Sequence, residues 1–442
     1  MKKDLTQGTV TKTMLMFACP MILGNLLQQL YNIADTFIVG RYLGADALAA
    51  VGSAYTLMTF LNSIQIGMCM GSGALFSYYF GKREEAEMKC SMQLSFLLIG
   101  AITLLLNFIV LVFCDPILCL LQVPEELMQM MHTYVWIIFM GIIFVFLYNY
   151  FAYLLRAVGN SVIPLYFLGS TAVINVLLDF VFVAVWNWGI GGAAIATVIS
   201  QAGSGIGLGC YTWWKEPNLR FERKYFQFTK VRVIENLRMS FSASIQQSVM
   251  NFGILMIQGL VNSFGTVVMA AFAAAVKIDS FAYMPAQEFG NAFSLFISQN
   301  YGAGKKERVH KGIKSAVKVS LLFCIVISLL VFASAPYLMQ LFISAEDVAI
   351  IQTGVGYLRV EGAFYCGIGV LFLLYGYYRG INRPEISLVL TIVSLGTRVL
   401  LAYLLSAVSW IGVWGIWSAI PIGWFLADAA GIIYLRRINH YD

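Results

Sequence analysis

The sequence contains few charged residues and few histidines. Only 11% of its 442 residues are charged and only three are histidines, whereas an average soluble domain has about 25% charged residues. So few charges cannot cover the surface of a soluble protein of this size. The eight cysteines are spaced singly and the histidines are scattered, which argues against disulfides and metal ligation. We therefore expect no cofactor, no metal centre and no enzyme activity, because no nucleophile stands near a base.

Apolar residues, in contrast, make up 60% of the chain and occur in long blocks. Blocks of twenty or more apolar residues match a helix that crosses about 30 Å of hydrocarbon. They are continuous and do not alternate, which favours helices over a barrel. The sequence therefore predicts an all-α, multi-pass protein of the cell membrane, with its first apolar block retained as a span. The twelve predicted spans are 13–40, 46–79, 92–114, 131–155, 163–186, 191–213, 239–263, 268–300, 315–342, 352–378, 385–408 and 411–435.

Lysine and arginine are concentrated in alternate loops. Most of the 28 basic residues fall in the two termini and the even-numbered loops, such as Lys82-Arg83, Lys215 to Arg238 and Lys305-Lys306. The positive-inside rule then places both termini in the cytoplasm. This bias accounts for the net charge of +6, so we expect membrane lipids rather than nucleic acid as the surroundings of these loops. We also expect a monomer.

The two halves of the sequence repeat each other. Gly44 to Ala50 aligns with Gly265 to Ala271, and Phe80-Gly81 aligns with Tyr301-Gly302 at the same offset. Each half contains six predicted spans, so both halves begin on the same side of the membrane. Such parallel repeats are related by a pseudo-two-fold axis along the membrane normal. We expect two six-helix lobes, 1–214 and 239–442, joined by a basic linker, 215–238, and working by alternating access.

Four polar side chains lie at a similar depth in the predicted spans of the first half. A carboxylate at the bilayer centre costs about 2.5–3.5 kcal/mol on insertion scales, so each one requires an explanation. Asp35 lies in the first span, Asn175 and Asp179 lie four residues apart on one face of the fifth, and Thr197 lies in the sixth. Together they could bind H⁺ or Na⁺. The alternative is that each one only packs between helices.

The aligned positions of the second half are Met256 and Ala402, so we expect the ion site in the first lobe only. In the second half, Arg398 lies inside a span, and Glu288 follows a proline. Glu288 could be a substrate contact, a second protonation site or half of a structural ion pair. Lys277 and Asp279 are two residues apart and should diverge on a helix.

Two other features of the spans bear on transport. Pro20 and Gly24 lie in the inner half of the first span, where a missing backbone hydrogen bond and a flexible glycine allow a kink. This kink could be static or moving. Aromatic residues make up 14% of the chain, and Tyr31 and Tyr55 are among those near the expected cleft. Aromatic faces suit organic cations, although packing at the membrane interface explains many of them as well.

Five segments of the sequence resemble those of the multidrug and toxic compound extrusion (MATE) family of secondary transporters. The resemblance implies a twelve-helix fold and export of cationic or amphipathic organic compounds in exchange for H⁺ or Na⁺. It also implies that Asp35, Asn175, Asp179 and Thr197 form a cation site, and that Pro20 takes part in bending. The segments are Pro20-Met21-Ile22-Leu23-Gly24, Ala34-Asp35-Thr36, Gly44 to Ala54, Asn175-Val176-Leu177-Leu178-Asp179 and Tyr301-Gly302-Ala303-Gly304-Lys305.

The second half departs from the NorM-type branch of that family. That branch carries acids in its seventh and tenth spans, where this chain has Met250 and Ile368. The chain is therefore more similar to the DinF-like branch. A flippase of lipid-linked oligosaccharides, from the same superfamily, is the alternative. It would need basic residues in the cleft to hold pyrophosphate, and Arg359 and Arg398 are the candidates.

Overall fold

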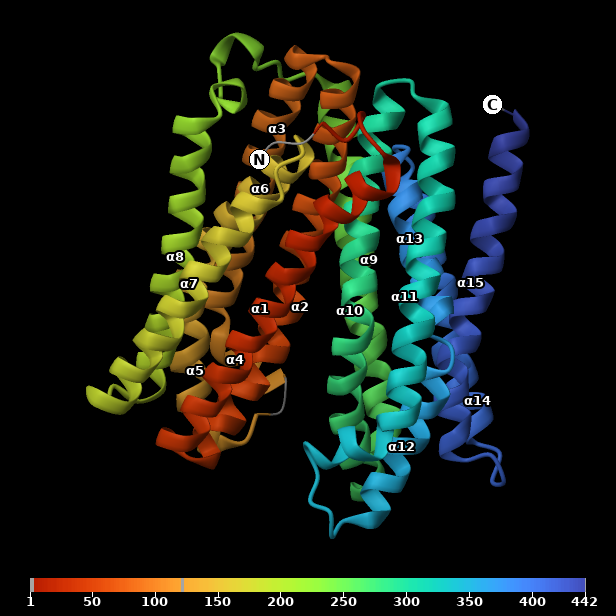
Figure 1. Cartoon of the computed structure of the whole chain (residues 1–442). Helices are drawn as coiled ribbons and strands as arrows, with labels where there is room; N and C mark the ends of the chain where they lie inside the picture. Colours follow the sequence, from red (N-terminus) through yellow and green to blue (C-terminus); the bar gives the residue numbers. More distant parts are fainter. Residues whose placement is uncertain (1–3, 121–122, 442) are drawn as a thin grey trace. The chain divides into compact units, whose positions relative to one another are not determined.

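The computed structural model describes residues 4–120 and 123–441, and within them the secondary structure is helical, without strands (Figure 1). Short turns join long helices, as the apolar blocks predict. The helices of the first half, in order, are α1 (Val10–Leu43), α2 (Ala45–Lys82), α3 (Glu85–Val112), α4 (Cys114–Leu120), α5 (Glu125–Met140), α6 (Ile142–Ala157), α7 (Val162–Asp179), the π-helix η1 (Phe180–Val185) and α8 (Gly189–Lys215).

The second half follows the same order without counterparts of the short helix α4 and of η1. Two single 3₁₀ turns, η2 (Pro217–Leu219) and η3 (Arg223–Tyr225), precede it. Its helices are α9 (Lys230–Asn262), α10 (Thr266–Gly302), α11 (Lys306–Gln340), α12 (Val348–Gly362), α13 (Tyr365–Gly380), α14 (Pro384–Ser406) and α15 (Val413–Tyr441).

These helices account for twelve membrane spans. Among the described residues, nine single helices are long and apolar enough to cross a membrane, and two bent pairs, α5 with α6 and α12 with α13, add one span each. The twelfth span is α9, whose 33 residues include charges in its first turns. The protein is therefore an all-α, multi-pass membrane protein with six spans in each half. This confirms the fold class expected from the sequence.

The longest helix of each half begins in the same way. Gly44 and Gly265 precede α2 and α10 with φ angles of 90° and 93°. A side chain at such an angle would be strained, so glycine is required at both positions. The helices that follow have 38 and 37 residues. The internal repeat predicted from the sequence therefore extends to the backbone conformation before these helices.

Two spans are bent, which the sequence analysis did not predict. The fourth span bends by 46° between α5 and α6, and the tenth by 51° between α12 and α13. At the first bend, a Cβ on Gly141 would lie 2.8 Å from the methyl carbons of Val198. Glycine therefore allows α8 to approach the bend closely.

By contacts, the chain forms two compact units. The first contains Cys19–Ser244, and the second contains Leu5–Ala18 and Ile245–Asp442. Both α1 and α9 are thus divided between the units. The segment before α9 and the first turns of α9 belong with the helices of the first half.

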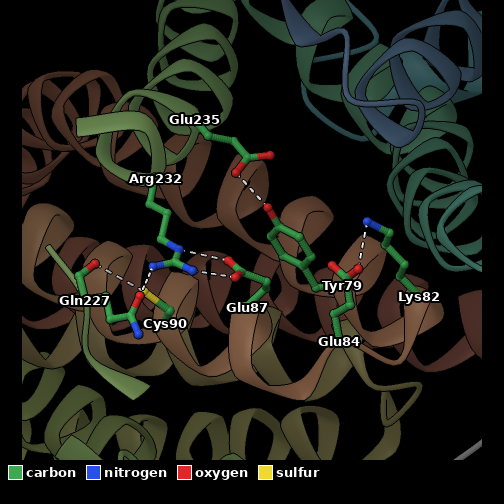
Figure 2. Close-up of polar contacts among 8 residues, drawn as sticks. All are labelled: Tyr79, Lys82, Glu84, Glu87, Cys90, Gln227, Arg232 and Glu235. Carbon is green, nitrogen blue, oxygen red and sulfur yellow. Dashed lines mark hydrogen bonds and ion pairs between the residues drawn. The ribbon is translucent and has the colours of Figure 1, made fainter. Parts of the chain in front are cut away.

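Side-chain contacts hold this segment on α2 and α3 (Figure 2). The guanidinium of Arg232 donates to both carboxylate oxygens of Glu87, at 2.9 and 2.5 Å, and also to the side chain of Gln227. Tyr79 donates its hydroxyl to Glu235 at 2.6 Å. Lys89 pairs with Glu222. The basic segment between α8 and α9 therefore packs against α2 and α3 within the first unit.

The start of α9 also packs closely against α2. A Cβ on Gly67 would lie 2.5 Å from the Cα of Ser244, and one on Gly71 would collide with the carbonyl of Met239. Two further contacts, between the hydroxyls of Ser72 and Ser240 at 2.8 Å and from Ser244 to the carbonyl of Ile64 at 2.9 Å, join the helices. Only glycines allow the two backbones to come this close.

Candidate functional site

The first unit contains a pair of carboxyl groups on two helices, one half-buried and one fully buried. Asp35 lies on α1, and Asp179 is the last residue of α7 and is fully buried. The two groups lie within hydrogen-bonding reach, so one can donate to the other when it carries a proton. Asn175, 2% exposed, is one turn before Asp179 on the same helix. We refer to Asp35, Asn175 and Asp179 as the first carboxylate site.

Most polar atoms of this site have no hydrogen-bond partner among the described residues. They are Oδ1 of Asp35, both oxygens of Asp179 and both amide atoms of Asn175. Buried polar groups are almost always paired, and an unpaired one costs about 1–3 kcal/mol. Two carboxylates side by side also repel each other unless a proton or a cation lies between them. The site is therefore built to bind a positive charge.

Three tyrosines surround the two carboxyl groups. Tyr31 on α1 and Tyr134 on α5 interact electrostatically with both aspartates, and Tyr55 on α2 interacts with both of these tyrosines. Tyr134 is 4% exposed and belongs to the apolar core formed by α1, α2, α5 and α8. A phenol hydroxyl can donate a hydrogen bond to a carboxylate, and its oxygen can act as a ligand of a bound cation. The sequence analysis singled out Tyr31 and Tyr55 but missed Tyr134.

The helix that carries Asp179 changes its geometry directly after this residue. The π-helix η1 runs over Phe180–Val185. π-Helical segments are rare in proteins, and those that occur are often found at functional sites. A stack of rings secures it, with the Phe182 centroid 5.1 Å from that of Trp186 and 4.8 Å from that of Trp188. The backbone of the fifth span is thus irregular at the position of the carboxylate pair.

The second unit contains a second buried pair of acids. Asp279 on α10 is 5% exposed and Glu361 on α12 is 1% exposed, and the two carboxyl groups interact directly. Tyr365, at the start of α13, donates its hydroxyl to Oδ1 of Asp279 at 2.7 Å. Oε1 of Glu361 has no hydrogen-bond partner among the described residues. The bend between α12 and α13 brings Glu361 and Tyr365 to the same acid.

These two acids line a cavity of about 70 Å³ that also contains Arg398 of α14. The guanidinium interacts electrostatically with both acids, but no ion pair joins it to either one within the described ranges. We refer to Asp279, Glu361 and Arg398 as the second carboxylate site. The aromatic residues of the cavity wall are Phe272, Tyr283, Tyr357, Phe372, Tyr375 and Trp424.

Comparison with known proteins shows the family of the chain. A family model described as MatE matches residues 20–181 and 241–404. The chain belongs to the MATE family. It is 30% identical over 436 residues to the probable multidrug resistance protein YpnP of Bacillus subtilis, covering 98% of this chain and 96% of that protein. It is 25% identical over 455 residues to a protein of Shewanella oneidensis named FAD transporter, covering 99% and 97%.

Solved structures show the same fold. One is described as the outward-facing conformation of a multidrug resistance MATE family transporter of the MOP superfamily. It superimposes with a TM-score of 0.92 at 22% identity, over 98% of this chain and 96% of that chain. Another is described as MATE in the bent conformation, with a TM-score of 0.91 at 22% identity and the same coverage. The twelve spans of this MATE chain therefore follow the family fold.

Thr197, Pro20 and Gly24 are the other residues of the first half for which the sequence predicts a role in transport. Thr197, on α8, donates its hydroxyl to the carbonyl of Ala193 at 3.0 Å. The helix α1 runs unbroken through Pro20, which lies two residues after the point where the two compact units divide it. A Cβ on Gly24 would make an ordinary contact of 3.5 Å with Leu168 on α7. The roles of these three residues remain predictions.

Glu288 contacts polar side chains of the second unit. It accepts a hydrogen bond from Asn291 at 3.2 Å, and Arg379 donates to the other side of the same amide at 3.1 Å. Arg379 also donates to Ser294 at 3.1 Å. This network lies outside the cavity wall of the second carboxylate site. The three roles considered for Glu288, namely a substrate contact, a second protonation site and half of a structural ion pair, stay predictions.

The second half of this MATE chain also contains acids deep within its spans, whereas the expectation that the ion site lies in the first lobe only stays a prediction. Asp279 is buried, whereas Lys277 is exposed, and Glu361 was overlooked inside the tenth predicted span. Met250 and Ile368, the positions at which the NorM-type branch is expected to carry acids, line the same cavity. The acids of this cavity therefore come from other positions. An acid within an apolar span, the signal used for Asp35, would have identified Glu361.

Proposed function

We propose that the protein is a secondary active antiporter of the cell membrane that exports organic compounds in exchange for H⁺ or Na⁺. The first carboxylate site is the observation that supports this function. It combines two interacting carboxyl groups, a buried amide and several unpaired polar atoms. Such a site binds a proton or a monovalent cation and changes its net charge when it does so.

Chemically, the residues of the first site suit both coupling ions. A shared proton would remove the repulsion between Asp35 and Asp179 and give each a hydrogen-bond partner. Na⁺, a hard cation, would find oxygen ligands in the two carboxylates and in the amide oxygen of Asn175. A charge that crosses a potential of 100 mV releases about 2.3 kcal/mol. This energy is enough to concentrate an uncharged substrate more than tenfold, since tenfold corresponds to about 1.4 kcal/mol. When one coupling ion is exchanged for one singly charged cation, the two charges cancel, and the concentration gradient of the ion drives export.

The substrates are proposed to be cationic or amphipathic compounds. Relatives named as multidrug resistance or export proteins support export of drugs. The acidic cavity of the second unit supports substrates that carry a positive charge. One relative is named FAD transporter, so the names of the relatives do not all refer to cationic substrates. The charge bias of the loops supports cytoplasmic termini, with export directed away from them.

Transport by the full chain in proteoliposomes tests this function. A pH gradient and a Na⁺ gradient are imposed separately while the movement of a fluorescent cation such as ethidium is recorded. One of the gradients should drive accumulation of the dye. Asp35→Asn and Asp179→Asn should each reduce this accumulation to that of protein-free liposomes, because an amide can neither release a proton nor neutralise Na⁺.

A matched control is Asp46→Asn, which changes an exposed acid in the first turn of α2. It should transport like the wild type. Monodisperse elution of each variant in detergent shows whether it is folded. If folded Asp35→Asn and Asp179→Asn variants transport normally, the first carboxylate site does not couple transport. If neither gradient drives any cation, the protein is not an antiporter of this class.

A further inference from the structure

The cavity in the second unit has a distinctive balance of charge. Of the residues that line it, Asp279, Glu361 and Arg398 are the charged ones, and each comes from a different helix. With both acids ionised, the wall carries a net charge of −1. The other titratable groups that face it are the tyrosines Tyr283, Tyr357 and Tyr375, and Lys277 of the same helix as Asp279 is exposed. A single positive charge would make the cavity neutral.

The acids of this cavity differ in how far they are already satisfied. Asp279 receives a hydrogen bond from Tyr365 at 2.7 Å. Glu361 is 1% exposed, and its Oε1 has no partner in the described part of the chain. An acceptor that is buried, unpaired and directed into a cavity indicates that a donor or a cation binds there. Nε of Arg398 also has no partner among the described residues. The guanidinium therefore does not use this nitrogen to donate to Oε1 of Glu361.

The walls of the cavity suit an organic cation better than a bare ion. Six aromatic rings line it, and the ring of Tyr357 packs edge-on against Trp417 at a centroid distance of 4.9 Å. Faces of aromatic rings attract ammonium groups through the negative charge of their π-systems. The volume of about 70 Å³ is several times the 10–15 Å³ that holds one water. There is room for a small ammonium group with its apolar substituents.

We propose that this cavity binds the ammonium group of a singly charged organic cation, with Asp279 and Glu361 as its counterions and Arg398 as the residue that limits it to one charge. This inference rests on the proposed export of organic cations and assigns a substrate site to it. Arg398 balances one of the two acids, so a dication would leave an excess positive charge in a buried place. Removing Arg398 would therefore strengthen the binding of cations.

Equilibrium binding by the purified full chain in detergent tests the proposal without any ion gradient. Calorimetry with benzyltrimethylammonium as the probe should show saturable binding, and neutral benzyl alcohol should show none. Asp279→Asn and Glu361→Gln should each weaken the binding of the probe at least tenfold, since each removes a buried counterion. The matched control is Asp428→Asn. Asp428 is 6% exposed, has an unpaired Oδ1 and belongs to the same unit, but it is not part of the cavity wall.

Arg398→Gln makes the decisive variant, because the proposal predicts a gain. The net charge of the wall becomes −2, so the affinity for the probe should rise severalfold and that for a bis-ammonium probe should rise more. Weaker binding of both probes by folded Arg398→Gln would overturn the role of Arg398. Binding of benzoate that depends on Arg398 would show an anion site instead. Displacement of the probe by equimolar Na⁺ would show that the cavity is an inorganic cation site.

The same assay separates this proposal from the proposed coupling. Asp35→Asn should retain saturable binding of the probe, with at most a moderate shift in affinity from the altered charge of the first site, even though it should not transport. If Asp35→Asn abolishes probe binding and Glu361→Gln does not, the substrate binds at the first carboxylate site and the inference is wrong. If the probe binds as expected while gradients drive no transport, the antiport function fails and the binding site stands.

Discussion

The two carboxylate sites of this MATE chain differ in what balances their charge. In the first unit, Asp35 and Asp179 face each other among tyrosines and an amide, and no described basic side chain pairs with them. In the second unit, Arg398 acts on both Asp279 and Glu361, and Tyr365 already donates to Asp279. An unbalanced pair must gain a proton or a cation to be stable in a dry site, whereas a partly balanced pair needs less.

This difference suggests a division of roles between the two halves of a repeated fold. The unbalanced pair is suited to binding and releasing the coupling ion, because each such event changes its net charge greatly. The balanced pair is suited to holding a substrate of defined charge. Both sites sit beside an irregular backbone, the π-helix after Asp179 and the bend after Glu361. The repeat thus supplies the framework, and the side chains that differ between the halves set the roles.

The units also differ in the contacts that hold the segment at the start of each half of the chain. The first unit holds α9 through ion pairs such as that of Arg232 with Glu87. The second holds the start of the chain through backbone carbonyls. Arg308 donates to the carbonyls of Leu5, Gln7 and Gly8, at 2.6–3.2 Å. Contacts between side-chain charges depend on pH and salt, whereas those to carbonyls depend on them less.

The largest effect is expected at the unbalanced carboxylate pair. Addition of a transported cation to wild-type protein in weakly buffered detergent should release protons if H⁺ is the coupling ion. Asp179→Asn should reduce this release at least about tenfold, because the pair can no longer exchange its proton. Glu361→Gln should retain most of the release at saturating substrate. A pH-sensitive dye measures it. Equal loss of release in both variants would contradict the difference between the sites.

The next largest effect is expected where α9 approaches α2. Gly67→Val should destabilise the protein by about 1–3 kcal/mol, the usual cost of overpacking, because its side chain would overlap the backbone at Ser244. Glu288 is the residue of the second half that aligns with Gly67, so the requirement for glycine at this position applies to the first half alone. A lowered melting temperature in detergent checks it. Gly52→Ala is the control, since nothing lies within 4 Å of its Cβ. Equal melting temperatures for the two variants would show that α9 does not dock as described.

A smaller effect is expected for the ion pair that holds α9. Arg232 and Glu87 are partly exposed, so their coupling should be about 0.5–1 kcal/mol. A double-mutant cycle with Arg232→Ala and Glu87→Ala, read by thermal unfolding, measures this coupling. It should shrink at high salt. Arg308→Ala in the second unit should show little salt dependence. Coupling near zero at low salt would mean that the close packing of α9 alone holds it.

The smallest effect concerns pH. The contacts of Glu222 with Lys224 and Lys89 hold its pKa below the ordinary value of 4.5. Its contribution is therefore complete above pH 4.5 and is lost as the pH falls through the lowered pKa. Hydrogen exchange of residues 216–229, corrected for intrinsic rates, should then accelerate in acid. Glu222→Gln should show faster exchange already at neutral pH. Identical exchange in the variant and the wild type at pH 7 would rule out a role for Glu222.

The spans could be predicted because each one depends on local sequence. Apolar blocks of membrane length identify helices without knowledge of their neighbours, and Asp35, Asn175 and Asp179 stand out as polar residues within such blocks. The bends after Gly141 and Gly362 were missed because apolar length alone does not report the angle between two half-helices. The start of α9 at Lys230 was missed because its first turns are charged and resemble a loop, although they are helical and docked on the first unit.

The amino-acid sequence by itself determined a helical membrane protein of two repeated halves, with acids inside its spans. Hydrophobic length, loop charge and internal similarity are properties of the chain, so they need no contacts to be read. Only the tertiary structure decided which acids meet. Asp279, Glu361 and Arg398 lie on three helices far apart in the sequence and share one cavity, while Lys277 turns away from it. The charge of a site is a sum over such neighbours, and neighbours are set by packing.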